Sequence, residues 1–259
     1  MSDALLTMKG ISKDFELADG SAIRAVNDVS LTVEENSVCV LLGPSGCGKS
    51  TILRMMAGLE DPSAGDIMLK QHPVMGPARE RGMVFQAYTS FDWLSVRKNV
   101  EFGMKINGVG ARERKEKAEH FIKLVGLEKF IDAYPTQLSG GMRQRVAIAR
   151  TLANGPELLL MDEPFGALDS QTRLQMQQLL LRIWEHKKKT VVFVTHDIDE
   201  AILLADRVFV MGSKPGHIRR ILNVDIPHPR TLDLAMEPEF IALKREVMDL
   251  LHDDLNEIH

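Results

Sequence analysis

The chain has 259 residues, 44% of them hydrophobic, which is enough to bury the core of one large domain or two small ones. Its formal net charge of -4 lacks the basic excess expected of a nonspecific nucleic-acid binder. No apolar run approaches the roughly 18 residues of a membrane-spanning helix, and residues 1–4 do not begin a secretory signal. The two cysteines, Cys39 and Cys47, fit neither a disulfide framework nor a zinc site, so we expect a reducing compartment.

The predicted elements begin with a β-hairpin. Residues 5–11 and 22–33 alternate apolar and polar side chains, and Asp19-Gly20 between them favours a tight turn, so this part is predicted to be an antiparallel β-subdomain. Short apolar patches bounded by turn residues follow, and such patches are typical of buried parallel strands in an α/β sheet. They lie at residues 38–42, 158–161, 191–194 and 208–211.

The polar stretch between these strands predicts helices. We expect residues from about 90 to about 156 to form a helical subdomain inserted between strands. A proline-rich linker later precedes apolar positions at helical spacing, which predicts a C-terminal amphipathic helix over residues 236–259. The rest, residues 5–235, is assigned to one α/β domain. The charge runs at residues 112–117 and 187–189 are interpreted as solvated helix faces and ends.

Residues 43–50 match the phosphate-loop pattern G-x-x-x-x-G-K-[ST]. The motif follows an apolar strand and precedes a good helix start, which is the context that it requires. Backbone N–H groups of the loop and the helix N-terminus would point at phosphate oxygens, Lys49 would reach the β- and γ-phosphates, and Ser50 would ligate Mg²⁺. The predicted fold is therefore that of a P-loop NTPase. The residues assigned to this site are Gly43, Pro44, Ser45, Gly46, Cys47, Gly48, Lys49, Ser50 and Thr51.

Two carboxylates follow the apolar strand at residues 158–161. In a parallel sheet, ligands bind at the carboxyl ends of the strands, so Asp162 and Glu163 would lie beside the phosphate loop. We expect Asp162 to hold Mg²⁺ and Glu163 to polarise the attacking water. Gln86 and His196 also follow apolar strands; Gln86 would serve Mg²⁺ or water, and His196 would contact the γ-phosphate. A purely structural role is the alternative for His196.

A second anion site is predicted at the motif Ser139-Gly140-Gly141. These residues precede an expected helix over residues 142–152, whose N-terminal amides and dipole would attract a phosphate. The alternative is an ordinary helix cap, because serine is a good N-cap residue and the glycines would then form a turn.

The order of these motifs resembles that of the ATP-binding cassette (ABC) family, from about residue 5 to about residue 210. The most specific feature is the signature at residues 138–142, which lies between Gln86 and Asp162. The resemblance implies an ATPase, with ATP and Mg²⁺ as its cofactors. The residues that it assigns to catalysis are Lys49, Gln86, Glu163 and His196, and those that it assigns to the metal are Ser50, Gln86 and Asp162.

The resemblance also implies that a single copy is incomplete. In the family the signature faces the γ-phosphate held by the phosphate loop of a second copy, so Ser139, Gly140 and Gly141 would complete the partner's site in a head-to-tail dimer. Phe15 occupies the position at which the family stacks an aromatic ring on adenine, and Asp169 belongs to the family's D-loop. A place in the core of the first sheet is the alternative for Phe15.

An aromatic and apolar cluster follows Gln86 in a chain with only 5% aromatic residues. The family uses this segment to grip a helix of the membrane domain, so the resemblance implies a groove for the coupling helix of a permease. Ordinary packing within the helical subdomain is the alternative. The cluster consists of Tyr88, Phe91, Trp93 and Leu94.

The same segment resembles that of the nitrate, sulfonate, taurine and bicarbonate importers, as do residues 134–137 and 226–230, although Phe91-Asp92 stands where leucine-proline is expected. The resemblance therefore implies an importer ATPase that powers uptake of a small oxyanion or sulfonate. Its partners would be permease subunits, a second copy of the chain and a solute-binding protein outside the cell, with no nucleic acid. Its place would be the cytoplasmic face of the inner membrane, as a peripheral protein.

Other functions share the same chemistry. The alternatives are the ATPase of an exporter or lipid-transport system, a soluble ABC ATPase that acts on nucleic acid, and a degenerate cassette. The acidic balance argues against the second, and the intact Lys49, Glu163 and His196 argue against the third. Cys47 offers a separate test: if its thiol is exposed, a thiol reagent should inactivate the protein and ATP should protect it.

Overall fold

The computed structural model describes residues 4–87, 89–186 and 188–256, and the chain divides into two compact units. The second unit is continuous, from residue 79 to residue 187, and the first contains the chain on both sides of it. The first unit contains β1 (Ala4–Glu16), β2 (Ala22–Glu34), β3 (Val38–Leu42), α1 (Lys49–Ala57), β4 (Ala64–Leu69), β5 (His72–Pro73), β8 (Thr190–Thr195), α6 (Ile198–Leu204), β9 (Arg207–Gly212), β10 (His217–Asn223) and α7 (Pro238–Asn256). The second contains β6 (Arg81–Val84), α2 (Val96–Ile106), α3 (Ala111–Leu124), α4 (Gly140–Ala153), β7 (Leu158–Asp162) and α5 (Ser170–His186).

The N-terminal strands form an antiparallel sheet in the order β2-β1-β4-β5. The turn between β1 and β2 is closed by the backbone N–H of Leu17, which donates to the carbonyl of Ser21 at 2.8 Å, and by the Asp19 carboxylate, which accepts from the N–H of Ser21 at 2.9 Å. One face of the sheet is buried through residues such as Leu6, Met8 and Ile11. This confirms the antiparallel β-subdomain that the alternating pattern predicts.

The strands that carry the motifs are parallel. In the first unit β3 pairs with β8 on one side and with β9 on the other, both in parallel, and β10 is antiparallel to β9. In the second unit β6 pairs with β7 in parallel, with Val84 opposite Met161. Every residue of β3, β7 and β8 is buried, as expected of strands covered on both faces. The chain thus has the α/β architecture predicted from its apolar patches.

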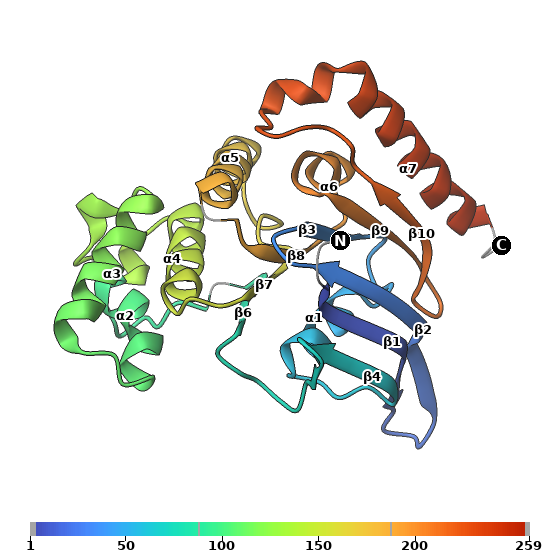
Figure 1. Ribbon diagram of the computed structural model, residues 1–259, viewed down its shortest axis with the longest axis horizontal. Coiled ribbons are helices and arrows are strands. Elements are labelled where there is room, and N and C mark those ends of the chain that lie inside the picture. The colour runs from blue at the N-terminus through green and yellow to red at the C-terminus, as the bar shows by residue number, and fades with distance from the viewer. Residues whose placement is uncertain (1–3, 88, 187, 257–259) are drawn as a thin grey trace. The chain divides into compact units, whose positions relative to one another are not determined.

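Three helices of the second unit, α2, α3 and α4, pack against one another (Figure 1). Their apolar faces meet through residues such as Val100, Ile122 and Val146, each of which has no exposed surface. The second unit contains the predicted helical segment of about 90–156, together with β6, β7 and α5. The charge run on α3 lies at the surface as expected, with Lys117 Nζ 2.6 Å from Glu113 Oε1.

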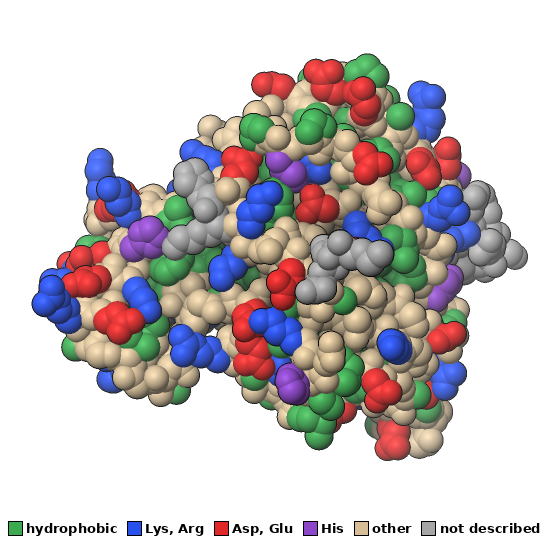
Figure 2. Space-filling view, viewed as in Figure 1, with side chains coloured by type: hydrophobic (Ala, Val, Ile, Leu, Met, Phe, Trp, Pro, Cys, Tyr) green, Lys and Arg blue, Asp and Glu red, His purple; other side chains and the backbone are tan. Residues whose placement is uncertain are grey.

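The C-terminal helix α7 packs on α6 and β9 within the first unit. Phe240 and Val247 are each only 1% exposed, and Lys244 Nζ lies 2.7 Å from the carboxylate of Asp199 on α6. Its other side is solvated, and Figure 2 shows acidic side chains gathered over it. This agrees with the amphipathic helix that the spacing predicts. None of the described helices is long and apolar enough to cross a membrane.

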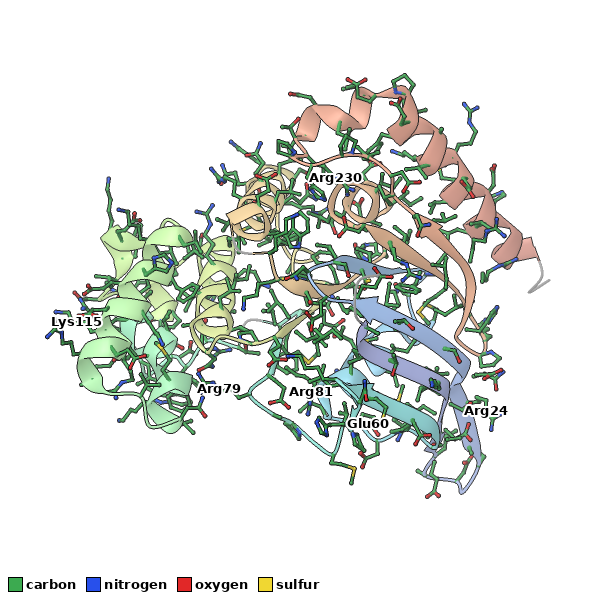
Figure 3. The ribbon with its side chains drawn as sticks, viewed as in Figure 1. Arg24, Glu60, Arg79, Arg81, Lys115 and Arg230 are labelled. Carbon is green, nitrogen blue, oxygen red and sulfur yellow. The ribbon has the colours of Figure 1, made fainter. Side chains whose placement is uncertain are left out.

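A buried arginine joins the segment before α7 to the end of α6. Arg230 is 4% exposed, and its guanidinium donates to the carbonyl of Ala205 at 2.5 Å and to that of Ile226 at 2.8 Å. Figure 3 shows Arg230 between these segments. The last carbonyls of a helix have no partner within the helix, so a cation here satisfies them and complements the helix dipole.

Replacing this residue is expected to destabilise the first unit. Arg230→Ala should lower the free energy of unfolding by about 3 kcal/mol, because buried carbonyls would lose charged donors and a cavity would remain. Urea unfolding followed by circular dichroism measures the change. The matched control is Arg24→Ala, because Arg24 is exposed and its guanidinium bonds the side chains of Asp14 and Asn27 at the surface. Equal unfolding midpoints for the two variants would contradict this role of Arg230.

Candidate functional site

The phosphate loop connects β3 to α1 and needs glycine at several positions. Gly46 and Gly48 have φ angles of +82° and +91°, which side chains with a Cβ rarely adopt. A Cβ on Gly43 would lie 2.8 Å from the carbonyl oxygen of Met211, so only glycine fits there. The N-cap of α1 is Gly48, and no side chain among the described residues caps this helix. The first N–H groups of α1 are therefore arranged as an anion site.

Lys49 is folded back over this loop. Its side chain is 4% exposed, and Nζ donates to the carbonyls of Gly43 and Pro44, each at 2.8 Å. The ammonium group is thus held against the carbonyl groups of the phosphate loop. Phosphate oxygens would be stronger acceptors than carbonyls for the same donor, so the residues present fit a nucleotide phosphate.

The thiol of Cys47 does not meet the condition for the reagent test. Cys47 is fully buried, with Sγ 3.8 Å from Lys49 Nζ. Burial also raises the pKa of the other thiol, Cys39, to about 11, which suppresses its reactive thiolate. The reagent test therefore does not apply to this conformation, because the loop packs the Cys47 side chain inward against Gly43.

His196 follows β8 and leaves the sheet at the same edge as the phosphate loop. Leu42, the last residue of β3, lies opposite Thr195 in the parallel β3–β8 pair. The turn after His196 is fixed, because Thr195 Oγ1 donates to Glu200 at 2.8 Å and accepts from the N–H of Asp197 at 3.0 Å. The His196 side chain itself is exposed, so it does not serve as a core residue.

In the second unit, Gln86 and Glu163 are brought together at the ends of β6 and β7. Gln86 Nε2 donates to Glu163 Oε2 at 3.3 Å. The neighbouring Asp162 is 4% exposed, whereas Glu163 is partly exposed, so the two carboxylates do point in different directions. Glu163 has a φ of +40°, an uncommon conformation for a residue other than glycine. Such backbone strain is found mostly at functional sites.

The signature forms the start of α4. Ser139 is the N-cap of α4, and its Oγ accepts from the N–H of Met142 at 3.3 Å. The ordinary helix cap, which is the alternative interpretation of this motif, is therefore present. A Cβ on Gly141 would collide with Thr172. The Asp169 carboxylate accepts from the N–H of the same Thr172 at 3.0 Å, and the hydrogen bonds from Thr172 lower the pKa of Asp169. Thr172, which sequence reasoning missed, thus links the signature to Asp169.

Phe15 ends β1 at the surface. Its side chain is 37% exposed, and Lys13 Nζ lies 5.0 Å from the ring centroid. It is therefore not a core residue of the first sheet, and an exposed ring is suited to stacking.

In the aromatic cluster after Gln86, Phe91 packs against other side chains, whereas Trp93 is exposed to solvent. The Phe91 ring lies 4.5 Å from that of Phe102 and 5.3 Å from that of Trp93, while Trp93 is 72% exposed. Arg150 lies 5.0 Å from the Phe91 ring and bonds Thr89. Tyr88 lies outside the described residues, and Leu94 is half-buried.

A buried asparagine shapes this segment. Asn99 has no exposed surface; its Oδ1 accepts from the N–H of Phe91 at 2.8 Å, and its Nδ2 donates to the carbonyl of Leu94, also at 2.8 Å. Asn99 therefore fixes the backbone that presents Trp93. Sequence reasoning missed it because a polar residue in an amphipathic helix is usually placed on the solvated face.

No group of three His, Cys, Asp or Glu side chains among the described residues could hold a metal ion. Mg²⁺ commonly binds through one or two protein ligands and shares the phosphates of its substrate. Ser50 offers a hydroxyl in the first unit and Asp162 a carboxylate in the second, and both are oxygen ligands of the kind that Mg²⁺ prefers.

The phosphate loop, the strand-end carboxylates and the second helix-start motif together define a P-loop NTPase with an ABC signature. The ABC transporter family matches residues 26–166, more than half of the chain. The chain belongs to this family and is an ATP-hydrolysing subunit of the ABC type.

The curated relatives include import ATPases. The nitrate import ATP-binding protein NrtD of Synechocystis is 44% identical, with 95% of this chain and 94% of that protein covered. The taurine import ATP-binding protein TauB of Jannaschia is 41% identical, with 98% and 96% covered. An uncharacterized ABC transporter ATP-binding protein of Methanocaldococcus jannaschii is 49% identical, with 96% and 92% covered.

The solved structures that resemble the chain are ABC cassettes. A dimeric post-hydrolysis ATP-binding cassette bound to ADP and Pi has a TM-score of 0.76 and 34% identity, with 86% of this chain and all of that chain covered. The cbiO1 protein of Clostridium perfringens, part of the transporter complex cbiONQ, has a TM-score of 0.76 and 27% identity, with 95% and 94% covered. These likenesses confirm the predicted P-loop cassette fold.

Proposed function

We propose that this chain powers the uptake of a small oxyanion or sulfonate, as a head-to-tail dimer bound to permease subunits at the cytoplasmic face of the membrane. The observation that carries the proposal is the identity of 41–44% to nitrate and taurine import ATPases over nearly the whole of each chain. The import names of these relatives favour import over export. A solute-binding protein outside the cell is proposed as a further partner.

The proposed hydrolysis follows from the residues already described. Lys49 and the loop amides bind the β- and γ-phosphates, and Ser50 and Asp162 hold Mg²⁺, which neutralises charge on the phosphates. Glu163 orients the attacking water and accepts its proton, while His196 donates to the γ-phosphate. The 3.3 Å contact with Glu163 supports a role for Gln86 in orienting this carboxylate or the water and metal beside it.

The proposed dimer supplies the rest of the site. Ser139, Gly140 and Gly141 of one copy would bind the γ-phosphate held by the other, through the N-terminal amides of α4. The dimeric structure of a similar ABC cassette bound to ADP and Pi supports a dimer. Phe15 would stack on the adenine, for which its exposed ring is available, and Asp169 would lie near the partner.

Substitution of the exposed Trp93 tests the proposed coupling to a permease. Trp93→Ala should lower uptake about tenfold or more, because buried aromatic side chains dominate the energy of protein interfaces. The ATPase rate of the isolated subunit should be unchanged, since Trp93 is 72% exposed in the absence of a partner. Uptake of nitrate and of taurine is measured in proteoliposomes that contain the permease and its solute-binding protein.

The matched control is Met75→Ala, which removes another exposed apolar side chain from the first unit, 88% exposed. Uptake should match that of the wild type in this variant. Normal uptake by Trp93→Ala would overturn the coupling role. If a functional transporter carries a solute that is neither an oxyanion nor a sulfonate, the proposed substrate class is wrong even if Trp93 couples as expected.

A further inference from the structure

A basic cavity lies in the second unit. Its volume is about 780 Å³, and it is lined by the end of α3 and the two residues after it, by Arg145 of α4 and by side chains of α5 between residues 175 and 183. Basic side chains from all three helices line it, and none of the described lining residues is acidic. These basic residues are His120, Lys123, Arg145 and Arg182.

The guanidinium of Arg145 is held at this cavity by neutral acceptors. Arg145 Nη1 donates to the carbonyl of Val125 and Nη2 to the side-chain oxygen of Gln175, each at 3.3 Å, and both acceptors are uncharged. Burial lowers the pKa of Arg145, and repulsion by Arg182 lowers it further. An anion bound in the cavity would be attracted by the basic side chains that line it.

The rest of the lining is apolar. Leu124, Leu179 and Ile183 line the same cavity, and Leu179 and Ile183 are each about 5–6% exposed. Pockets for small organic ligands typically measure about 300–1,000 Å³ and combine apolar walls with a few convergent polar groups. An inorganic oxyanion would fill only a small part of this cavity and would leave its apolar walls without a partner. A ligand with an organic group fits both the size and the apolar walls better.

We infer that this cavity binds a small organic phosphate, with the phosphate between Arg145 and Arg182 and the organic group against Leu179 and Ile183. Guanidinium groups suit this role because their planar N–H donors match phosphate oxygens in pairs. Lys123 and His120 add positive charge at the rim. None of the residues assigned above to ATP, Mg²⁺ or the permease lines the cavity, so the inference does not depend on the proposed transport function.

The test uses phenyl phosphate, inorganic phosphate and benzyl alcohol as probes, with isothermal titration calorimetry on the full chain. Phenyl phosphate carries both charge and ring, whereas the other two probes carry only one of these features. Phenyl phosphate should bind at least about tenfold more tightly than either, because charge-assisted hydrogen bonds and apolar burial then act together. The probes could also bind at the phosphate loop. Variants of residues that line the cavity distinguish binding in the cavity from binding at that loop.

The decisive variant is Arg182→Glu, which reverses an exposed charge at the rim of the cavity. It should weaken phenyl phosphate binding about tenfold or more. Lys123→Glu is a second variant of the same rim and should act in the same direction. The matched control is Lys115→Glu, at a position that is also exposed on α3 but does not line the cavity (Figure 3). Circular dichroism checks that each variant folds.

Three results would overturn the inference. The first is wild-type affinity for phenyl phosphate in both Arg182→Glu and Lys123→Glu, because any binding would then lie elsewhere. The second is binding of phenyl phosphate that is no tighter than that of inorganic phosphate, because the cavity would then not recognise the organic group. The third is a loss of binding in Lys115→Glu equal to that in Arg182→Glu, since net charge alone would then explain the effect.

Discussion

Glu163→Gln should lower the rate of ATP hydrolysis by about 100-fold to 1,000-fold, because a side chain that accepts a proton in the transition state contributes about that much. The substitution keeps the size of the side chain and an oxygen that accepts from Gln86 Nε2. ATP binding should therefore persist, and the ATP-bound dimer should accumulate because it is no longer consumed. Phosphate release measures the rate, and light scattering after size-exclusion chromatography measures the dimer.

The matched control is Glu128→Gln, an exposed position in the same unit that follows α3. This variant should hydrolyse ATP at the wild-type rate and form no excess of dimer. A Glu163→Gln protein that hydrolyses ATP normally would remove Glu163 from the proposed chemistry. A protein that loses hydrolysis but stays monomeric with ATP would instead contradict the proposed dimer.

Lys49→Ala should weaken ATP binding about 100-fold, since two charge-assisted hydrogen bonds of roughly 1.5 kcal/mol each would be lost from the phosphates. Lys49 is 4% exposed and bonds two loop carbonyls, so the folded state could also change. Urea unfolding without nucleotide separates the two effects. ATP affinity is measured by calorimetry, and wild-type affinity in a folded Lys49→Ala protein would contradict the assigned role.

Much of the fold could be predicted because local patterns specify it. The apolar patch at residues 38–42 coincides with β3, and the Asp19-Gly20 pair lies in the turn of the first hairpin. The strand β10 was missed, since its sequence from His217 to Asn223 includes adjacent arginines and lacks a clear period of two. It is an edge strand with several exposed residues, and such strands carry a weak hydrophobic signal.

The site was predicted best where a motif is short and contiguous. The phosphate loop and the start of α4 are stretches of this kind, so their glycines and Ser139 could be assigned directly. The contact between Gln86 and Glu163, the carbonyl bonds of Arg230 and the bonds of Asn99 to Phe91 join residues that the sequence does not mark as partners. The sequence also leaves open whether the Cys47 thiol is exposed, because its burial depends on how the loop packs.

We propose that each ATP site takes its phosphate loop from one copy of the chain and its signature from the other. Lys49→Ala and Ser139→Arg should each abolish hydrolysis alone. Mixed in equal amounts, they should regain about a quarter of the wild-type rate, because half of the dimers are mixed and each of those keeps one of its two sites intact. No recovery on mixing two folded variants that still dimerise would contradict the claim, since a site built within one chain would stay inactive in both.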